Sequence, residues 1–353
     1  MNHPQNHGAS RILWVTATIL AVLIVLTILP DPTPPAIAAG IPTGDYHFAV
    51  SSSGGDENTG DLFWVLDDHA GTLLLYQALE EQGEATLLDP KSAVREAADS
   101  PRIDSAAEML INAKSPVIIA GGGVGLGNAH DALIELAEAL QAGVFTTLNG
   151  KSAIPWSNPF NLGMNRGASA STPAGKYYQE ADVVIGVGSR LAGLGGSIVP
   201  GDKKVIHIDI DSEEIGRSHD NTYGLAGDAG KTMKELAARI RSAGSRPSQV
   251  DKIADVKKTV FDSAPGTQPQ WDILQSLQAG VPDDTILIPD STQIGYYSMA
   301  FWKVASQNSY IGSGYSGNLG FAFPTGLGAK VAQPDRPVVV VAGDGGFMYN
   351  VSE

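Results

Sequence analysis

Short, continuously apolar runs alternate with amphipathic stretches through most of the chain beyond about residue 89. Apolar runs of this kind are typical of parallel strands that helices cover on both faces. They predict strands at 116–120, 144–148, 182–188, 204–211, 285–289 and 337–341. Helical periodicity predicts helices at 105–113, 129–140, 231–241, 271–278 and 323–332. The pattern therefore predicts an α/β protein built on parallel sheets.

A polar stretch interrupts this alternation. Residues 244–268 contain scattered Gly, Ser and Pro, a composition typical of an interdomain linker. We expect a Rossmann-like central domain with a parallel sheet over residues 89–243. A partial second α/β domain is expected over residues 269–353.

The N-terminal segment, residues 1–40, has a different character. Residues 12–29 form an uncharged run of 18 residues, near the lower limit of the ~17–25 that cross a membrane as a helix. Ala36-Ile37-Ala38 matches a signal-peptide cleavage pattern. The run predicts a hydrophobic helix, and two readings stay open: an uncleaved membrane anchor, or a cleaved signal that exports the chain.

Residues 41–88 form the connection to the α/β region. Their first part is rich in Pro, Gly, Ser and Asp, as linkers are. Apolar runs at 62–66 and 72–76 then flank a polar turn that ends in glycine. This arrangement predicts a β-hairpin, so we expect a linker followed by a small hairpin appendage.

Composition and charge exclude several classes of function. Asp and Glu number 38 against 23 Lys and Arg, a net charge of -15, which argues against a nucleic-acid partner. The absence of cysteine excludes disulfide scaffolds, zinc–thiolate sites, iron–sulfur clusters and thiol nucleophiles. The H-E-x-x-H metal motif and the G-x-S-x-G nucleophile elbow are also absent. The 41 glycines gather in separate turns between apolar runs, which suggests ligand loops.

The segment Gly343-Asp344-Gly345-Gly346 directly follows an apolar strand. Open α/β sheets bind ligands at the carboxyl ends of their strands. Glycines let a diphosphate approach backbone amides closely, and a carboxylate beside phosphate oxygens suits Mg²⁺. The alternative is an ordinary strand-to-loop turn in which Asp344 makes only local hydrogen bonds.

The context of this segment narrows the interpretation. A glycine-rich stretch at 312–320, a helix at 323–332 and Pro334-Asp335-Arg336 precede the strand and its Gly-Asp-Gly-Gly turn. This order resembles the diphosphate-binding domain of thiamine-diphosphate enzymes of the acetolactate synthase type. Residues 106–240 resemble the central domain of the same family. The resemblance implies thiamine diphosphate and Mg²⁺ as cofactors, and decarboxylation or carboligation of a small-molecule 2-oxo acid.

The resemblance also assigns roles to individual residues. It implies that Asp344 ligates Mg²⁺ and that Gly343, Gly345 and Gly346 line the diphosphate. It places Leu319 between the two rings of the cofactor. Further cofactor contacts are implied for Gly317 and Asn318 at the pyrimidine side, and for Gln293 at the diphosphate.

Some members of this family bind FAD in the central domain. Here Gly121-Gly122-Gly123 follows a strand, as an adenine-nucleotide loop does, but the third glycine of G-x-G-x-x-G is missing. A structural domain with an empty crevice is the alternative. If flavin binds, the candidate contacts are Gly122, Gly123, Leu148, Gly163, Met164, Ser189, Arg190, Asp209 and Asp228.

Two parts of the family's catalytic site have no counterpart in this sequence. Relatives use a Glu of an N-terminal pyrimidine-binding domain and an Asn ~25–30 residues beyond the Asp of the diphosphate motif. We therefore name no catalytic residue and expect catalysis to need a homo-oligomer or a complementing subunit that supplies the pyrimidine-binding domain. A truncated or fused chain and a membrane-tethered FAD-binding module are alternative readings. The family resemblance implies a cytoplasmic location, which conflicts with the N-terminal segment.

Overall fold

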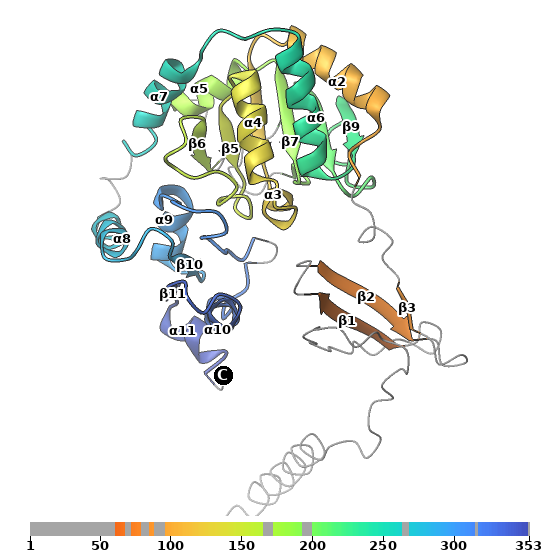
Figure 1. The fold of residues 1–353 in the computed structure, drawn as a ribbon. Coiled ribbons are helices and arrows are strands. Elements are labelled where there is room, and N and C mark those ends of the chain that lie inside the picture. The colour runs from red at the N-terminus through yellow and green to blue at the C-terminus, as the bar shows by residue number, and fades with distance from the viewer. Residues whose placement is uncertain are drawn as a thin grey trace, which may run out of the picture. The chain divides into compact units, whose positions relative to one another are not determined.

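A computed structural model describes residues 61–67, 72–78, 85–87, 96–164, 172–192, 200–262, 268–314 and 317–351 (Figure 1). The chain divides into two compact units, Met1–Ala93 and Val94–Glu353. The hydrophobic helix expected within residues 1–40 lies outside the described residues. Among the helices that are described, none is long and apolar enough to span a membrane.

The first unit contains a small antiparallel sheet. Its strands are β1 (Asp61–Asp67), β2 (Thr72–Ala78) and β3 (Ala85–Leu87), in that spatial order. Trp64 pairs with Leu75 in the β1–β2 register. The hairpin predicted from the two apolar runs is confirmed, and a third strand that the sequence analysis missed extends it.

The second unit is built on a six-stranded parallel sheet, which confirms the predicted α/β class. Its strand order is β6-β5-β4-β7-β8-β9. The chain runs outward from β4 in one direction and then returns to begin again at β7, the doubly wound arrangement. The strands are β4 (Pro116–Ala120), β5 (Val144–Thr146), β6 (Asn161–Met164), β7 (Val183–Val187), β8 (Lys204–Asp209) and β9 (Thr222–Ala226).

Helices α2 (Ser100–Asn112), α4 (His130–Leu140) and α6 (Ala229–Ser242) lie side by side over one face of this sheet (Figure 1). Each helix buries a stripe of apolar side chains spaced three or four residues apart, as an amphipathic helix on a sheet must. In α4 and α6 the buried stripes include Leu133, Leu136, Leu140, Met233, Leu236 and Ile240. They pack on the fully buried strand residues and form the main core of the unit.

Two further helices lie near the β6 end of the sheet. Helix α5 (Pro173–Gln179) is followed along the chain by β7, and helix α7 (Val250–Lys258) packs against α5 and β6. Helix α7 falls within residues 244–268, which the sequence analysis interpreted as a linker. It buries Ile253 and Val256 in the main core, so this stretch contains a packed helix. The helix was missed because only these two positions of α7 are buried.

The last part of the described chain forms a smaller α/β layer. Strands β10 (Ile286–Pro289) and β11 (Val338–Val341) pair in parallel, with Leu287 opposite Val339. The surrounding helices are α8 (Gln270–Ala279), α9 (Gln293–Phe301), α10 (Ala322–Ala332) and α11 (Asp344–Met348). Helix α9 was not predicted from the sequence.

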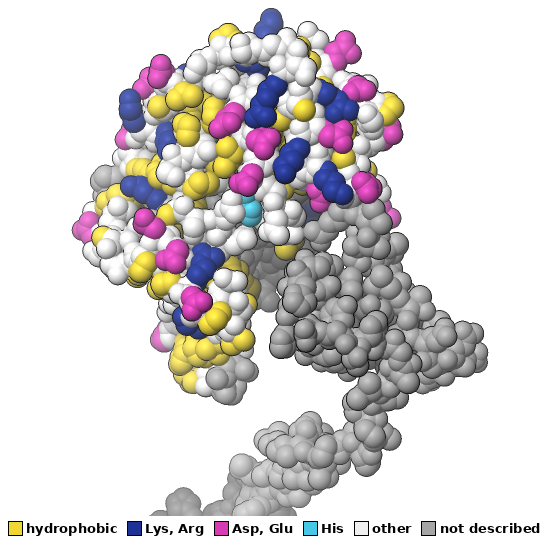
Figure 2. Space-filling model, viewed as in Figure 1, with side chains coloured by type: hydrophobic (Ala, Val, Ile, Leu, Met, Phe, Trp, Pro, Cys, Tyr) yellow, Lys and Arg dark blue, Asp and Glu magenta, His cyan; other side chains and the backbone are white. Residues whose placement is uncertain are grey.

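The surfaces of the two parts of this unit differ. Figure 2 shows charged side chains of both signs spread over the face that carries α2, α4 and α6, and apolar side chains gathered toward the C-terminal end of the described chain. Large apolar side chains exposed on this end include Leu327, Val331, Phe347, Met348 and Val351.

Candidate functional site

Three loops meet at the carboxyl edge of the β10–β11 pair. Residues 290–292 follow β10, the glycine-rich segment leads into α10, and residues 342–343 follow β11. The amide of Asp290 in the first loop donates to the carbonyl oxygen of Val341, the last residue of β11, at 2.8 Å, so the first loop lies beside the end of β11. Because ligands of open α/β sheets bind at this edge, the loops are the place to look for a site.

A buried carboxylate holds the glycine-rich loop against this edge. The Asp290 side chain is only 2% exposed. Its Oδ1 accepts a hydrogen bond from the amide of Ser291 at 2.8 Å, and its Oδ2 accepts from Gly320 at 2.9 Å and from Ala322 at 3.4 Å. Backbone amides thus compensate the buried charge, as a buried carboxylate requires.

The Gly-Asp-Gly-Gly turn packs against the same carboxylate. A Cβ atom at Gly346 would lie 3.0 Å from Asp290 Oδ2, so the close approach favours glycine there. Gly320 has a φ of 81°, in the left-handed region that favours glycine. Its carbonyl oxygen accepts a hydrogen bond from Asn350 Nδ2 at 2.7 Å. These contacts join the residues after β11 to the loop before α10.

Asp344 lies on the solvent-exposed side of the Gly-Asp-Gly-Gly turn. It is the first residue of α11, with Gly343 as the preceding cap, and its side chain is exposed. Its Oδ1 accepts a hydrogen bond from the amide of Gly345 at 2.8 Å. A Cβ at Gly345 would have open space around it. The carboxylate therefore makes the local bond of an ordinary turn and still faces solvent, where a ligand can reach it.

The other predicted cofactor contacts lie on the same edge. Gln293 is the first residue of α9, is exposed, and accepts a hydrogen bond from Gln270. The carbonyl of Gly317 accepts from Ser291 Oγ at 3.2 Å, and the amide of Asn318 donates to a neighbouring serine at 3.2 Å. Leu319 is 52% exposed, so this aliphatic side chain does not serve the core.

Sequence reasoning missed the organising roles of Asp290 and Asn350. The sequence does carry a signal for Asp290, because this aspartate directly follows an apolar strand, and Asp344 lies three residues beyond the other strand of the same pair. No local pattern identifies Asn350, whose partner lies 30 residues away in sequence.

A buried lysine connects the central domain to α9. Lys151 is 3% exposed, and its Nζ donates to the carbonyl oxygen of Met299, in the last turn of α9, at 2.7 Å. The ammonium also lies 5.3 Å from the centre of the Tyr310 ring. Burial disfavours the charged form and lowers the pKa of Lys151 from 10.5 to about 7. This contact positions the helix whose N-terminus carries Gln293.

The nine candidate FAD contacts lie at the carboxyl ends of the strands of the central sheet or just beyond them. Packing accounts for the glycine run there: the amide of Gly123 donates to the carbonyl of Gly188 at 3.0 Å, and a Cβ at Gly121 would lie 2.2 Å from that same oxygen. Gly122 begins helix α3 (Gly122–Leu126), Leu148 follows β5, and Gly163 and Met164 end β6; Ser189 and Arg190 follow β7, Asp209 ends β8 and Asp228 follows β9.

Several of these candidates already have partners within the fold. Asp209 Oδ1 accepts a hydrogen bond from the backbone amide of Asp211 at 2.9 Å. Asp228 is the N-cap of α6, and its Oδ1 accepts a hydrogen bond from the backbone amide of Lys231 at 2.9 Å. Leu148 packs against Gly312, because a Cβ atom at Gly312 would lie 3.1 Å from the Leu148 side chain. The flavin assignment of these residues stays a prediction.

Within the described part of the chain, no group of three or more His, Asp or Glu side chains is arranged to hold a metal ion. A metal bound by protein side chains alone would need such a group. A site in which one carboxylate and the phosphates of a ligand share Mg²⁺ does not.

Comparison with known proteins identifies the two parts of the second unit. Residues 103–236 match the model of the thiamine pyrophosphate enzyme central domain. Residues 290–353 match the model of the C-terminal domain of the same enzymes, described as TPP-binding. The second match contains all three loops of the candidate site.

Individual relatives agree with these matches. The chain is 34% identical over 276 residues to a probable acetolactate synthase large subunit of Methanococcus aeolicus, covering 71% of this chain and 46% of the relative. It is 32% identical over 259 residues to a probable 2-ketoarginine decarboxylase of Pseudomonas aeruginosa, covering 72% of this chain and 45% of the relative. A sulfoacetaldehyde acetyltransferase of Roseovarius nubinhibens is 30% identical over 282 residues, covering 71% of this chain and 47% of the relative.

The chain spans about half the length of the curated relatives it matches. The central-domain model covers the doubly wound sheet, and the C-terminal-domain model covers the loops at the β10–β11 edge. The two matches follow one another along the chain in the order that the names of the domains imply. The chain belongs to the thiamine pyrophosphate enzymes.

Proposed function

We propose that the three loops at the β10–β11 edge bind thiamine diphosphate together with Mg²⁺. The observation that carries this proposal is the position of Asp290. Its carboxylate accepts a hydrogen bond from Gly320 of the glycine-rich loop and packs closely against Gly346, while the Asp344 carboxylate remains exposed to solvent.

The residues present suit this cofactor. Asp344 offers a carboxylate oxygen to Mg²⁺, which favours one or two protein carboxylates beside phosphate oxygens. Gly343, Gly345 and Gly346 are candidates to line the diphosphate, and open space beside Gly345 gives room for it. Leu319 offers an exposed apolar surface for the rings, between Asn318 and the buried Gly320.

The proposed reaction class is decarboxylation or carboligation of a small 2-oxo acid. When bound, thiamine diphosphate supplies the electron sink that cleavage of a bond next to a carbonyl requires. The names of two relatives support this class, since they are a probable acetolactate synthase large subunit and a probable 2-ketoarginine decarboxylase. We further propose that a pyrimidine-binding domain comes from a second copy or a complementing subunit.

Calorimetric titration of the full chain tests cofactor binding. We expect saturable binding of thiamine diphosphate in the presence of Mg²⁺ and much weaker binding in EDTA. Asp344→Ala should abolish the Mg²⁺ dependence without changing the unfolding transition, because the side chain is exposed and makes one local bond.

Asp335→Ala is the matched control, since Asp335 is exposed in the turn before β11. It should bind the cofactor as the unaltered chain does. The proposal fails if the unaltered chain does not bind thiamine diphosphate with Mg²⁺, or if Asp344→Ala binds it equally well. Turnover of 2-oxo acids, measured separately with and without added subunits, tests the reaction class.

A further inference from the structure

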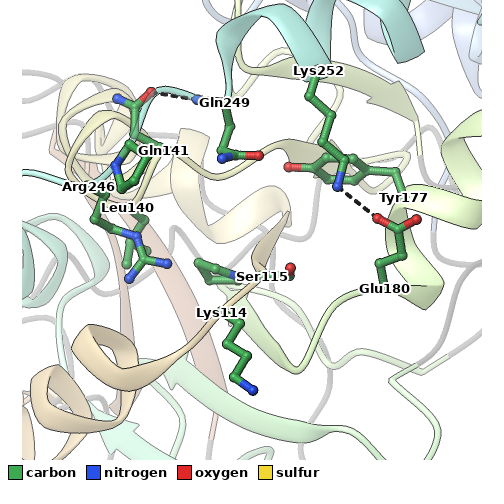
Figure 3. Close-up of a pocket in the computed structure, with 11 residues that line it drawn as sticks. Lys114, Ser115, Leu140, Gln141, Tyr177, Glu180, Arg246, Gln249 and Lys252 are labelled. Carbon is green, nitrogen blue, oxygen red and sulfur yellow. Dashed lines mark hydrogen bonds and ion pairs between the residues drawn. The ribbon is translucent and has the colours of Figure 1, made fainter.

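A cavity of about 110 Å³ lies at the amino edge of the central sheet, away from the loops of the candidate site (Figure 3). Its floor is formed by Ser115 and Pro116, where β4 begins. Its walls come from the C-terminal ends of α4 and α5, and from the segment that enters α7. Four separate parts of the chain therefore converge on a hollow that the cofactor proposal does not use.

Arg246 provides a positive charge at one wall. Its guanidinium donates to the carbonyl oxygens of Leu110 at 3.2 Å, Ile111 at 3.4 Å and Ala113 at 2.7 Å, at the end of α2. Arginine has five N–H donors, so two remain after these bonds. Among the described side chains, no carboxylate lies within 4.0 Å of this guanidinium. Within the described part of the chain, the charge of Arg246 is therefore met by backbone carbonyls and by no carboxylate.

The opposite wall adds little net charge. Lys252 Nζ and Glu180 Oε2 lie 2.7 Å apart and form an ion pair. Figure 3 shows the Lys114 ammonium pointing away from the middle of the cavity. Behind the floor, the Asp182 carboxylate accepts hydrogen bonds from the amides of Lys114 at 2.7 Å and Ser115 at 3.0 Å. The groups around the cavity thus favour a monoanion over a dianion.

A neutral amide and apolar groups complete the lining. The Gln249 side chain points into the cavity in Figure 3, and its backbone amide is held by Gln141 Oε1 at 3.3 Å. Leu140 and Pro116 are buried and present hydrocarbon, as does the ring of Tyr177. An apolar cavity of about 150 Å³ accommodates benzene. The present one accordingly has room for about four or five non-hydrogen atoms.

We propose that this cavity binds a small organic monocarboxylate. The carboxylate takes the two remaining N–H donors of Arg246, whose planar fork matches its two oxygens. The Gln249 amide donates to the same group, and a short aliphatic body rests on Leu140 and Pro116. The site is separate from the cofactor loops, so its occupancy does not depend on the proposed function.

Saturation-transfer NMR on the full chain tests the proposal, with propionate as the probe and propionamide as its neutral counterpart. We expect saturable binding of propionate and at least about tenfold weaker binding of propionamide, because the charge-assisted bonds to arginine are lost. Inorganic phosphate should not displace propionate at equal concentration. Displacement by phosphate would overturn the assignment to a carboxylate.

Two variants locate the binding. Arg246→Lys keeps the charge but loses the fork, and Gln249→Leu removes the amide with nearly unchanged volume; each should weaken propionate binding about fivefold to tenfold. Lys234→Gln, at an exposed position of α6, is the control and should bind normally. Arg246→Lys should also lose stability, because the bonds of Arg246 hold the end of α2. If this variant does not fold, propionate binding by Gln249→Leu tests the proposal alone. Unchanged propionate binding in Gln249→Leu, or equal binding of propionamide, would overturn the proposal.

Discussion

Asp290 Oδ2 accepts a hydrogen bond from the backbone amide of Gly320 at 2.9 Å, so the residue after β10 holds the loop that leads into α10. The same oxygen lies 3.0 Å from the position of a Cβ at Gly346. One buried carboxylate therefore sets the distance between the loop and the turn that carries Asp344. The geometry of the candidate site depends on Asp290, which itself faces the protein interior.

Replacing Asp290 by Asn should destabilise the chain by about 2–3 kcal/mol, because a donor NH₂ group would face backbone N–H groups and the charge-assisted bonds would be lost. Urea unfolding at pH 7 measures this change. Asp283→Asn, exposed just before β10, should change the free energy of unfolding by less than about 0.5 kcal/mol. Similar values for the two variants would contradict the organising role of Asp290.

Gly320→Ala should destabilise the chain by about 2 kcal/mol or more, because it strains a backbone with a φ of 81° and brings a Cβ within 2.6 Å of Asn350 Nδ2. Gly328→Ala is the opposite control. Gly328 lies exposed in α10 with open space around a Cβ, so alanine should stabilise the helix by about 0.5–1 kcal/mol. Thermal unfolding of the two variants should shift in opposite directions, and a shift in the same direction would argue against this backbone geometry.

Lys151 should make the stability of the chain depend on pH. Its pKa is lowered to about 7 in the folded chain and is 10.5 for an ordinary lysine. Between these values the unfolded chain binds more protons, so the free energy of unfolding should rise with pH, by at most about 1.4 kcal/mol per pH unit. Below pH 7 both states are protonated and this contribution to the slope vanishes.

Lys151→Met removes the titrating group and retains an unbranched side chain. The unfolding free energy of the unaltered chain minus that of this variant should increase as the pH rises from 7 to 9, when both are measured by urea unfolding. Lys234→Met, at an exposed site, should show no such trend. A constant difference for Lys151→Met across this range would show that the buried lysine is not neutralised.

Ile253→Ala should destabilise the chain by about 2–4 kcal/mol, because Ile253 is fully buried between α7 and the central sheet. Lys258→Ala, which removes an exposed ion pair on the same helix, should leave the free energy of unfolding nearly unchanged. Chemical denaturation distinguishes these values. If both variants lose equally little stability, residues 250–258 behave as a linker after all.

The hydrophobic pattern predicted the elements that bury continuous runs. The predicted strand at 116–120 and helix at 129–140 agree with β4 and α4 to within one residue. It missed β6 and β9, whose residues include polar and glycine positions, and α7, which buries only two residues. In these elements, contacts distant in sequence decide the conformation, and a local pattern carries little of that information.

By itself the sequence determined the α/β class, the family, and the presence of a carboxylate between glycines after a buried strand. Each of these features depends on residues that are close together in the sequence, so a local pattern is enough to identify it. The tertiary structure decided how the loops meet. The bond from Asp290 to Gly320 spans 30 residues, the bond from Asn350 to Gly320 spans another 30, and Lys151 reaches α9 across 148. Such contacts depend on the order of strands in the sheets and on which faces the helices bury, and only the folded chain brings these residues together.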